Sequence, residues 1–126
     1  MTKDFTIEII SPDEKIFAGK SEEVILPCYE GQVTILRDHI PLITFLRPGL
    51  IIVGNDSKFF VEEGTVEFSE NNLLILSNSV KNLKNIKNEE ISEMIKDSEK
   101  KISNNQVSDK QRYILSYKIE TLKNIN

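Results

Sequence analysis

The chain has 126 residues, of which 29% are charged and 39% are hydrophobic, and its formal net charge is −4. This length accommodates one sizeable core with a small appendage and excludes two large domains. No apolar run approaches the roughly 20 residues that a membrane-spanning helix needs, and the single cysteine, Cys28, excludes an internal disulfide.

Charge is distributed unevenly along the chain. Residues 1–80 contain 6 basic and 13 acidic residues, whereas residues 81–126 contain 10 basic and 7 acidic residues. This asymmetry predicts two segments that contact different partners. The second segment has only a small excess of basic residues and no aromatic platform between them. This argues against a nucleic-acid partner.

Residues 4–77 carry the pattern of short β-strands. Phe5, Ile7 and Ile9 alternate with polar residues, as expected for a strand with one buried face. Many short strands at a spacing of about 8–12 residues are typical of an antiparallel sandwich or barrel, which we predict for residues 1–80. The other predicted strands contain Val24 and Leu26, Val33 and Ile35, and residues 50–53, 58–61, 65–68 and 73–76, with a hairpin turn at residues 54–57.

The apolar period changes after residue 78, where a linker rich in Asn and Lys leads into a predicted helix. Asn88 is the expected N-cap. The negative charges of Glu89 and Glu90 in the first turn would interact favourably with the positive end of the helix dipole. Residues 103–105 (Ser-Asn-Asn) interrupt the helical pattern. One face of this helix is apolar and consists of Ile91, Met94, Ile95 and Ile102.

A second helix is predicted from the capping-box pair Ser108 and Gln111. Its apolar stripe consists of Leu115, Ile119 and Leu122. Because the connection is short, the two helices should fold back on each other as an antiparallel hairpin. The predicted fold is therefore α+β by segment, with the β-sandwich or barrel in residues 1–80 and the linker and helical hairpin in residues 81–126.

The predicted hairpin has too little internal contact to stand alone. Each helix spans only about 15 residues, which is marginal for an isolated helix in water. The second helix also places Tyr113, Ile114, Tyr117 and Ile125 outside its main stripe. We therefore expect a movable element that packs against its own sandwich or against another protein.

The run from Leu26 to Gly49, LPCYEGQVTILRDHIPLITFLRPG, carries a distinctive arrangement of turns and short apolar segments. It resembles the epsilon subunit family of bacterial F-type ATP synthase, in which this stretch reads roughly LPG-x-EG-x-x-G-x-LPGHAPLLT-x-LKPG. The order of sandwich and hairpin also matches that family. The shared positions are Leu26, Pro27, Glu30, Gly31, Leu36, His39, Pro41, Leu42, Thr44, Leu46, Pro48 and Gly49.

Several positions depart from the family pattern. Cys28, Thr34 and Asp38 replace glycines, Arg37 replaces a proline, and Glu62 and Glu63 replace the usual Ser-Gly before Gly64. The alternation of apolar residues is preserved, so we interpret the changes as divergence within one fold. The acidic pair before Gly64 is interpreted as part of exposed strand ends and a turn rather than as a cation site.

The resemblance implies a non-catalytic rotor subunit, located peripherally at the cytoplasmic face of the bacterial inner membrane. It implies that the sandwich binds the gamma subunit and sits on the c-ring, which would be the chain's contact with the membrane. The hairpin would either fold on the sandwich or extend along gamma towards the alpha and beta subunits, where it inhibits ATP hydrolysis. Neither a homo-oligomer nor a nucleic-acid partner is expected.

The resemblance also implies roles for particular residues. The edge that faces the c-ring corresponds to Glu30, Gly31, Gln32, Asp38 and His39. In the extended hairpin, a basic set would meet an acidic segment of the beta subunit by electrostatic steering. This basic set consists of Lys110, Arg112, Lys118 and Lys123.

Some members of the family bind ATP through a motif similar to Ile-Asp-x-x-Arg-Ala at the start of the first helix. The aligned residues begin at Ile86, with Lys87 in place of the aspartate, Glu90 in place of the arginine and Ile91 at the last position. A glutamate would repel the phosphates that an arginine binds. We therefore expect no ATP binding at this motif and no cofactor.

One alternative remains open from the sequence: a small standalone enzyme or ligand-binding sandwich with chemistry at Cys28 and His39. The lone histidine next to Asp38 invites this interpretation, but a surface contact or a structural turn is favoured. A lone histidine and a lone cysteine lack further metal ligands at ordered spacing. No catalytic residue and no metal site is predicted.

Overall fold

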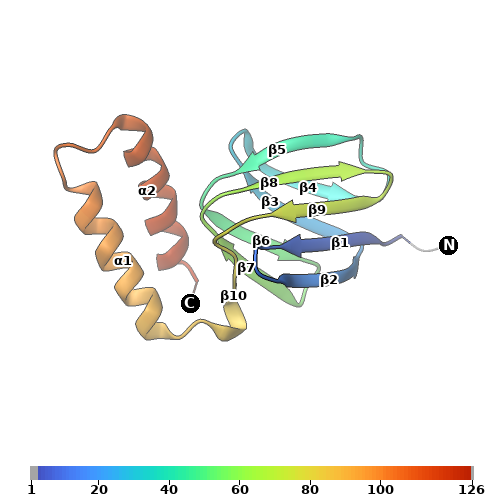
Figure 1. Ribbon diagram of the computed structural model, residues 1–126, viewed down its shortest axis with the longest axis horizontal. Coiled ribbons are helices and arrows are strands. Elements are labelled where there is room, and N and C mark those ends of the chain that lie inside the picture. Colours follow the sequence, from blue (N-terminus) through green and yellow to red (C-terminus); the bar gives the residue numbers. More distant parts are fainter. Residues whose placement is uncertain (1–2, 126) are drawn as a thin grey trace.

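The computed structural model describes residues 3–125, so Met1, Thr2 and Asn126 lie outside the described residues. A curled β-sheet is followed by two antiparallel helices (Figure 1). The strands are β1 (Phe5–Ile10), β2 (Lys15–Ser21), β3 (Glu23–Cys28), β4 (Gly31–Leu36), β5 (Leu42–Leu46), β6 (Gly49–Val53), β7 (Ser57–Val61), β8 (Gly64–Ser69), β9 (Asn72–Leu76) and β10 (Lys81–Asn82). The helices are the 3₁₀ turn η1 (Leu83–Asn85), α1 (Asn88–Ile102) and α2 (Asp109–Lys123).

The strands follow the order β10-β7-β6-β3-β5-β8-β9-β1-β2, and β4 pairs with β3 outside this path. Strand β3 links the two halves of the sandwich, because it pairs with β6 at Val24 and Ile25 and with β5 at Cys28. The pairs are antiparallel except β1 and β9, which run parallel. The sandwich predicted from the alternating pattern is confirmed, with one parallel pair inside it.

The core of the sandwich is built from alternate residues of most strands. In β1, Phe5, Ile7 and Ile9 are buried and the residues between them are partly exposed, as the period of two predicted. Phe5 and Phe68 meet edge to face with ring centroids 5.5 Å apart, a favourable aromatic geometry. The predicted hairpin turn at residues 54–57 is also confirmed, and Gly54 there has a φ of 59°.

Three strands of the sheet were not predicted individually: β2, β5 and the short β10, which lies in the predicted linker but pairs with β7. Strand β2 is the terminal strand of the sheet, and its mixed sequence KIFAGKS buries no residue fully. Strand β5 has apolar residues on both faces, because Ile43 and Phe45 are exposed while Leu46 is buried. Neither β2 nor β5 therefore shows the alternation of apolar and polar residues that identifies a half-buried strand.

The two predicted helices are present, with one correction at the start of α1. Lys87, not Asn88, is the N-cap residue, and no side chain accepts a capping hydrogen bond there. Glu89 and Glu90 do lie in the first turn. In α2, Ser108 and Gln111 form the predicted capping box, with a distance of 3.1 Å from the Gln111 backbone nitrogen to Ser108 Oγ.

The hairpin packs against the sheet with α2 on the side nearer the strands (Figure 1). Phe60 of β7 is buried together with Ile91 of α1 and Leu122 of α2. We call this group the docking cluster, and it is separate from the core of the sandwich. Its partly buried members are Leu50, Leu83, Ile86, Met94, Ile95 and Ile125. The hairpin thus obtains the further surface that its sequence requires. No helix within residues 3–125 is long and apolar enough to cross a membrane.

Candidate functional site

The turn between β3 and β4 is fixed by a hydrogen bond from a buried hydroxyl. Thr44, 2% exposed, lies 2.6 and 2.8 Å from the two carboxylate oxygens of the exposed Glu30. This hydroxyl, followed by the backbone of the turn, lowers the pKa of the Glu30 carboxyl. Gly31 has a φ of 127°, which residues with a side chain rarely adopt. The turn therefore presents an ionised carboxylate in a defined position.

The turn between β4 and β5 is fixed to a neighbouring loop. Asp38, in the left-handed region with a φ of 67°, and Asn71 exchange two hydrogen bonds. The Asp38 backbone N–H donates to Asn71 Oδ1 at 2.7 Å, and Asn71 Nδ2 donates to Asp38 Oδ1 at 2.9 Å. The half-buried His39 ring meets Phe68 edge to face, and its Nδ1 lies 2.7 Å from the Ile40 carbonyl oxygen.

The five residues predicted to face the c-ring do not form one cluster. Glu30, Gly31 and Gln32 lie at the beginning of β4, whereas Asp38 and His39 follow its end. Four strand residues, Val33 to Leu36, lie between the two groups, which places the groups at opposite ends of β4. What the groups share is the strand β4, whose described pairing is with β3 alone.

Cys28 and His39 do not form a catalytic pair. Cys28 is completely buried, and its partner in the β3–β4 ladder is Gly31, at the opposite end of β4 from His39. Burial, assisted by the charge of Glu30, raises the pKa of the Cys28 thiol to about 11, so the reactive thiolate is disfavoured. Within residues 3–125 no group of three or more His, Cys, Asp or Glu side chains is placed to hold a metal. The standalone-enzyme alternative finds no support.

An exposed apolar face on the outer side of β5, β8 and β9 was missed from the sequence. Ile43 is 78% exposed, Phe45 59% and Leu76 45%. The strand register aligns Phe45 with Thr65 and Thr65 with Leu76, so these side chains lie along one face. Between β5 and β9 this face carries the polar Thr65 and Glu67 of β8. Exposed large apolar side chains gathered on one sheet face are typical of a protein contact surface. The signal in the sequence was the run Leu42–Leu46, which is apolar on both faces.

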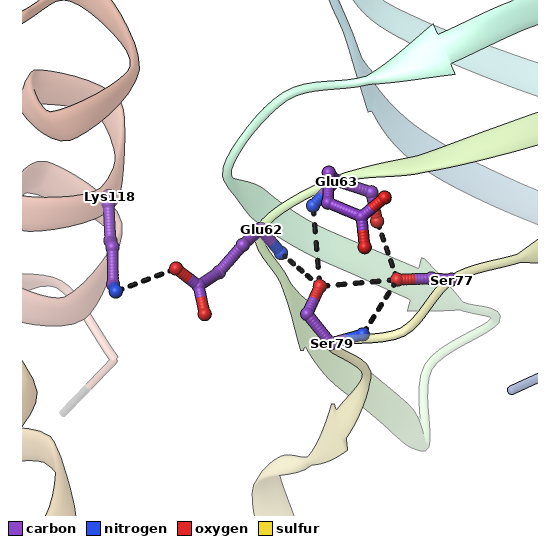
Figure 2. Close-up of polar contacts among 5 residues, drawn as sticks. All are labelled: Glu62, Glu63, Ser77, Ser79 and Lys118. Atoms are coloured by element: carbon purple, nitrogen blue, oxygen red, sulfur yellow. Dashed lines mark hydrogen bonds and ion pairs between the residues drawn. The ribbon is translucent and has the colours of Figure 1, made fainter. Parts of the chain in front are cut away.

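Three of the four basic residues predicted to meet the beta subunit already have partners. Arg112 donates to the Ile102 carbonyl oxygen at 2.7 Å and so covers the end of α1. Lys123 pairs with Glu99 at 3.5 Å within the hairpin. Lys118 reaches the sheet, where its Nζ lies 2.6 Å from an oxygen of Glu62 (Figure 2). Lys110 is exposed.

The segment aligned with the ATP-binding motif serves the packing of the hairpin. Lys87 is the N-cap of α1, Glu90 is exposed in the first turn, and Ile91 is 5% exposed in the docking cluster. The acidic Glu90 occupies the position of the motif's arginine. The lack of ATP binding at this position remains a prediction.

Comparisons with known proteins agree on one family. Residues 4–82 match the family model of the ATP synthase delta/epsilon chain β-sandwich domain. The ATP synthase epsilon chain of Pelagibacter ubique is 40% identical over an alignment of 131 positions that covers all of both chains. The epsilon chain of a Bradyrhizobium species is 31% identical and covers 87% of this chain and 84% of the relative.

Two solved structures share the fold at low identity. A chain of the Euglena gracilis mitochondrial ATP synthase, determined as OSCP/F1/c-ring, aligns with a TM-score of 0.77 and 16% identity, covering 98% of this chain and 81% of that one. A chain of the Tetrahymena thermophila mitochondrial ATP synthase central stalk and c-ring aligns with a TM-score of 0.65 and 14% identity. That alignment covers 95% of this chain and 92% of the other. By its sequence matches and its fold, the chain belongs to the epsilon chain family of ATP synthase.

Proposed function

We propose that the chain is a non-catalytic rotor subunit that connects the gamma subunit to the c-ring and regulates ATP hydrolysis through its hairpin. In this proposal residues 1–80 are the coupling domain and residues 81–126 are the regulatory segment. The observation that carries it is the exposed apolar face of β5, β8 and β9 in a chain of this family. A sheet face of this kind is costly to leave in water and needs a protein partner.

The gamma subunit is the proposed occupant of this apolar face. Ile43 and Phe45 supply large apolar side chains on β5, and Leu76, across Thr65 of β8, extends the face onto β9. Burying side chains of this size against a partner contributes about 1.5–3 kcal/mol each before the costs of association. The face therefore suits a lasting contact of the kind that transmits torque.

The c-ring is proposed to contact β4 and its two flanking turns. The exposed Glu30 and Gln32 lie at one end and Asp38 and His39 at the other. The anchoring of Glu30 by Thr44, and of Asp38 by Asn71, presents polar groups in fixed positions to the polar loops of the ring. A polar, hydrated rim is compatible with such a contact. Contact with the membrane would then occur through the ring, at the cytoplasmic face.

The hairpin is proposed to inhibit hydrolysis when it leaves the sheet and extends towards the alpha and beta subunits. Lys110, Arg112, Lys118 and Lys123 would then become available to an acidic segment of the beta subunit. Undocking requires that the ion pair of Lys118 with Glu62 and the contacts of the docking cluster separate. The docked arrangement is therefore the non-inhibiting state.

The experiment is binding to the cognate alpha-beta-gamma complex with ATPase activity followed in parallel. The variant Ile43→Ser/Phe45→Ser should lower affinity for the complex at least tenfold, because both side chains lose their apolar contact. Leu36→Ser, which changes an apolar side chain 53% exposed at the end of β4, is the matched control and should bind normally. Equal binding by the double variant and the control would refute gamma as the occupant of this face.

The regulatory part is tested with a chain that ends at residue 87, which keeps β10 and η1 in the sheet. It should bind the complex as the full chain does, but only the full chain should suppress hydrolysis. If both bind and neither suppresses hydrolysis, the hairpin has no inhibitory role. If neither binds, the rotor proposal itself is wrong.

A further inference from the structure

The turn between β7 and β8 carries the acidic pair Glu62 and Glu63. We propose that Glu62 and Lys118 form a latch that holds the hairpin on the sheet and withholds Lys118 from the beta subunit. The latch is a contact within this chain that joins the β7–β8 turn to α2. Its regulatory consequence rests on the proposed function, whereas its structural part does not.

The Glu62–Lys118 ion pair differs from the other ion pairs of the described residues in position and in burial. Its 2.6 Å distance joins the sheet to α2, with the Lys118 side chain 14% and the Glu62 side chain 39% exposed. Glu8–Lys15 lies within the sheet and Glu99–Lys123 within the hairpin, and all four of those side chains are at least 40% exposed. Partial removal from water strengthens the attraction and makes the loss of one partner costly.

The backbone around Glu62 is held in place by two serines that precede β10 (Figure 2). The backbone N–H groups of Glu62 and Glu63 both donate to Ser79 Oγ, at 3.0 and 3.3 Å. Ser77 donates its hydroxyl to the Glu63 carbonyl oxygen and lies 3.2 Å from the Ser79 hydroxyl. Because the turn is already fixed, the ion pair orders fewer groups than a surface ion pair does.

A second contact holds the adjacent residue of α2. The Arg47 guanidinium lies 3.9 Å from the centroid of the Tyr117 ring, within the range of a cation–π interaction. Arg47 is itself oriented by a 3.1 Å hydrogen bond from Nη1 to the Pro48 carbonyl oxygen. Tyr117 and Lys118 thus fix α2 to two separate segments of the sheet. The Arg47 contact remains when Glu62 is changed, so loss of the latch should loosen the hairpin without unfolding it.

In this proposal, Glu62 and the beta subunit compete for the ammonium group of Lys118. The same ammonium group cannot pair with Glu62 and with an acidic segment of the beta subunit, so the internal carboxylate opposes the inhibitory state. Removing Glu62 should therefore favour undocking and leave Lys118 free. Removing Lys118 should favour undocking but also remove one contact of the extended state. The two variants are thus expected to agree in docking and to differ in inhibition.

Docking is measured on the isolated full chain through a thiol at Leu122, which is fully buried in the docking cluster. Leu122→Cys itself weakens the docking cluster, so all rates are compared within this one background. In it the alkylation rate follows the undocked population, and the buried native Cys28 contributes little. Glu62→Gln and Lys118→Gln should each raise this rate about tenfold. Lys110→Gln removes the same charge from an exposed position of α2 and should leave the rate unchanged.

The charge-exchanged variant Glu62→Lys/Lys118→Glu should return the rate towards that of the parent. High salt should raise the parent rate more than that of Glu62→Gln. The latch is refuted if Glu62→Gln alkylates no faster than Lys110→Gln, or if the charge exchange fails to slow the reaction. A faster alkylation of Glu62→Gln with unchanged ATPase inhibition would support the latch and count against the inhibitory role of the hairpin.

Discussion

Pro27 and Gly49, both positions of the shared family run, are explained by their contact with each other. A Cβ atom added to Gly49 would lie 2.5 Å from Pro27 Cβ, closer than two such atoms approach in proteins. Thr44 has a comparable role, since its hydroxyl binds the Glu30 carboxylate. These family positions therefore specify how the strands approach one another and how one turn is fixed. They do not by themselves identify the surface that a partner covers.

Cys28 leads to a prediction about pH. Its pKa is about 11 in the folded chain, against an ordinary value of 9.0, so the folded state retains a proton that the unfolded state loses between these values. The contribution to stability is complete below pH 9 and is lost as the pH rises towards 11. The free energy of unfolding, measured by urea denaturation, should fall by up to about 1.4 kcal/mol per pH unit in this range.

The control for this prediction is Cys28→Ala, which removes the titrating group while other residues titrate as before. The difference between the two pH profiles isolates the thiol. At pH 8 the folded parent should also react slowly with a thiol reagent and the urea-unfolded chain rapidly. Parallel pH profiles for parent and variant would show that the thiol ionises equally in both states.

At the scale of elements, periodicity predicted the structure where one face of a segment is buried and the other is exposed. Strand β1 and helix α2 meet this condition, and both were predicted correctly. Strand β5 was not recognised because its exposed side also carries large apolar residues, Ile43 and Phe45. Asn88 was misplaced as the N-cap because the backbone at Lys87 is still extended, and side-chain capping preference does not determine that geometry.

Ser98 gives a prediction for α1. It is 1% exposed, and its hydroxyl is buried without a hydrogen-bond partner in the described structure. Ser98→Ala removes this unsatisfied group and also favours the helix, so it should stabilise the hairpin by about 1–2 kcal/mol. The measurement is hydrogen exchange of the α1 amides.

Ser92→Ala is the matched control for this substitution, because Ser92 lies on the exposed face of the same helix. It gains only the helix propensity of alanine, about 0.5 kcal/mol. The difference between the two variants gives the cost of the buried hydroxyl. Equal stabilisation by both would show that the Ser98 hydroxyl is satisfied in solution.

At the scale of the whole molecule, the contacts between residues 1–80 and residues 81–126 could not be predicted from the sequence. Glu62 and Lys118 are 56 positions apart, and each was interpreted from its neighbours alone, one as a solvated strand end and the other as a contact to a partner. The two turns that were expected to form one site facing the c-ring lie at opposite ends of β4, so they do not meet. Composition and periodicity describe segments, whereas pairs of this kind depend on how the segments pack.

The separation of the docking cluster from the sandwich core predicts two levels of stability. Leu122→Ala removes a fully buried side chain from the docking cluster and should destabilise the docked hairpin by about 2–4 kcal/mol. Amides of α1 and α2 should then exchange faster, whereas those of β1 and β9 should keep their rates, because Leu122 is outside the sandwich core. Leu115→Ala, at a half-buried position outside the docking cluster, should have a smaller effect on the helices. Equal acceleration of strand and helix amides would instead show that the molecule unfolds as one unit, and a hairpin that moves independently of the sheet would then be excluded.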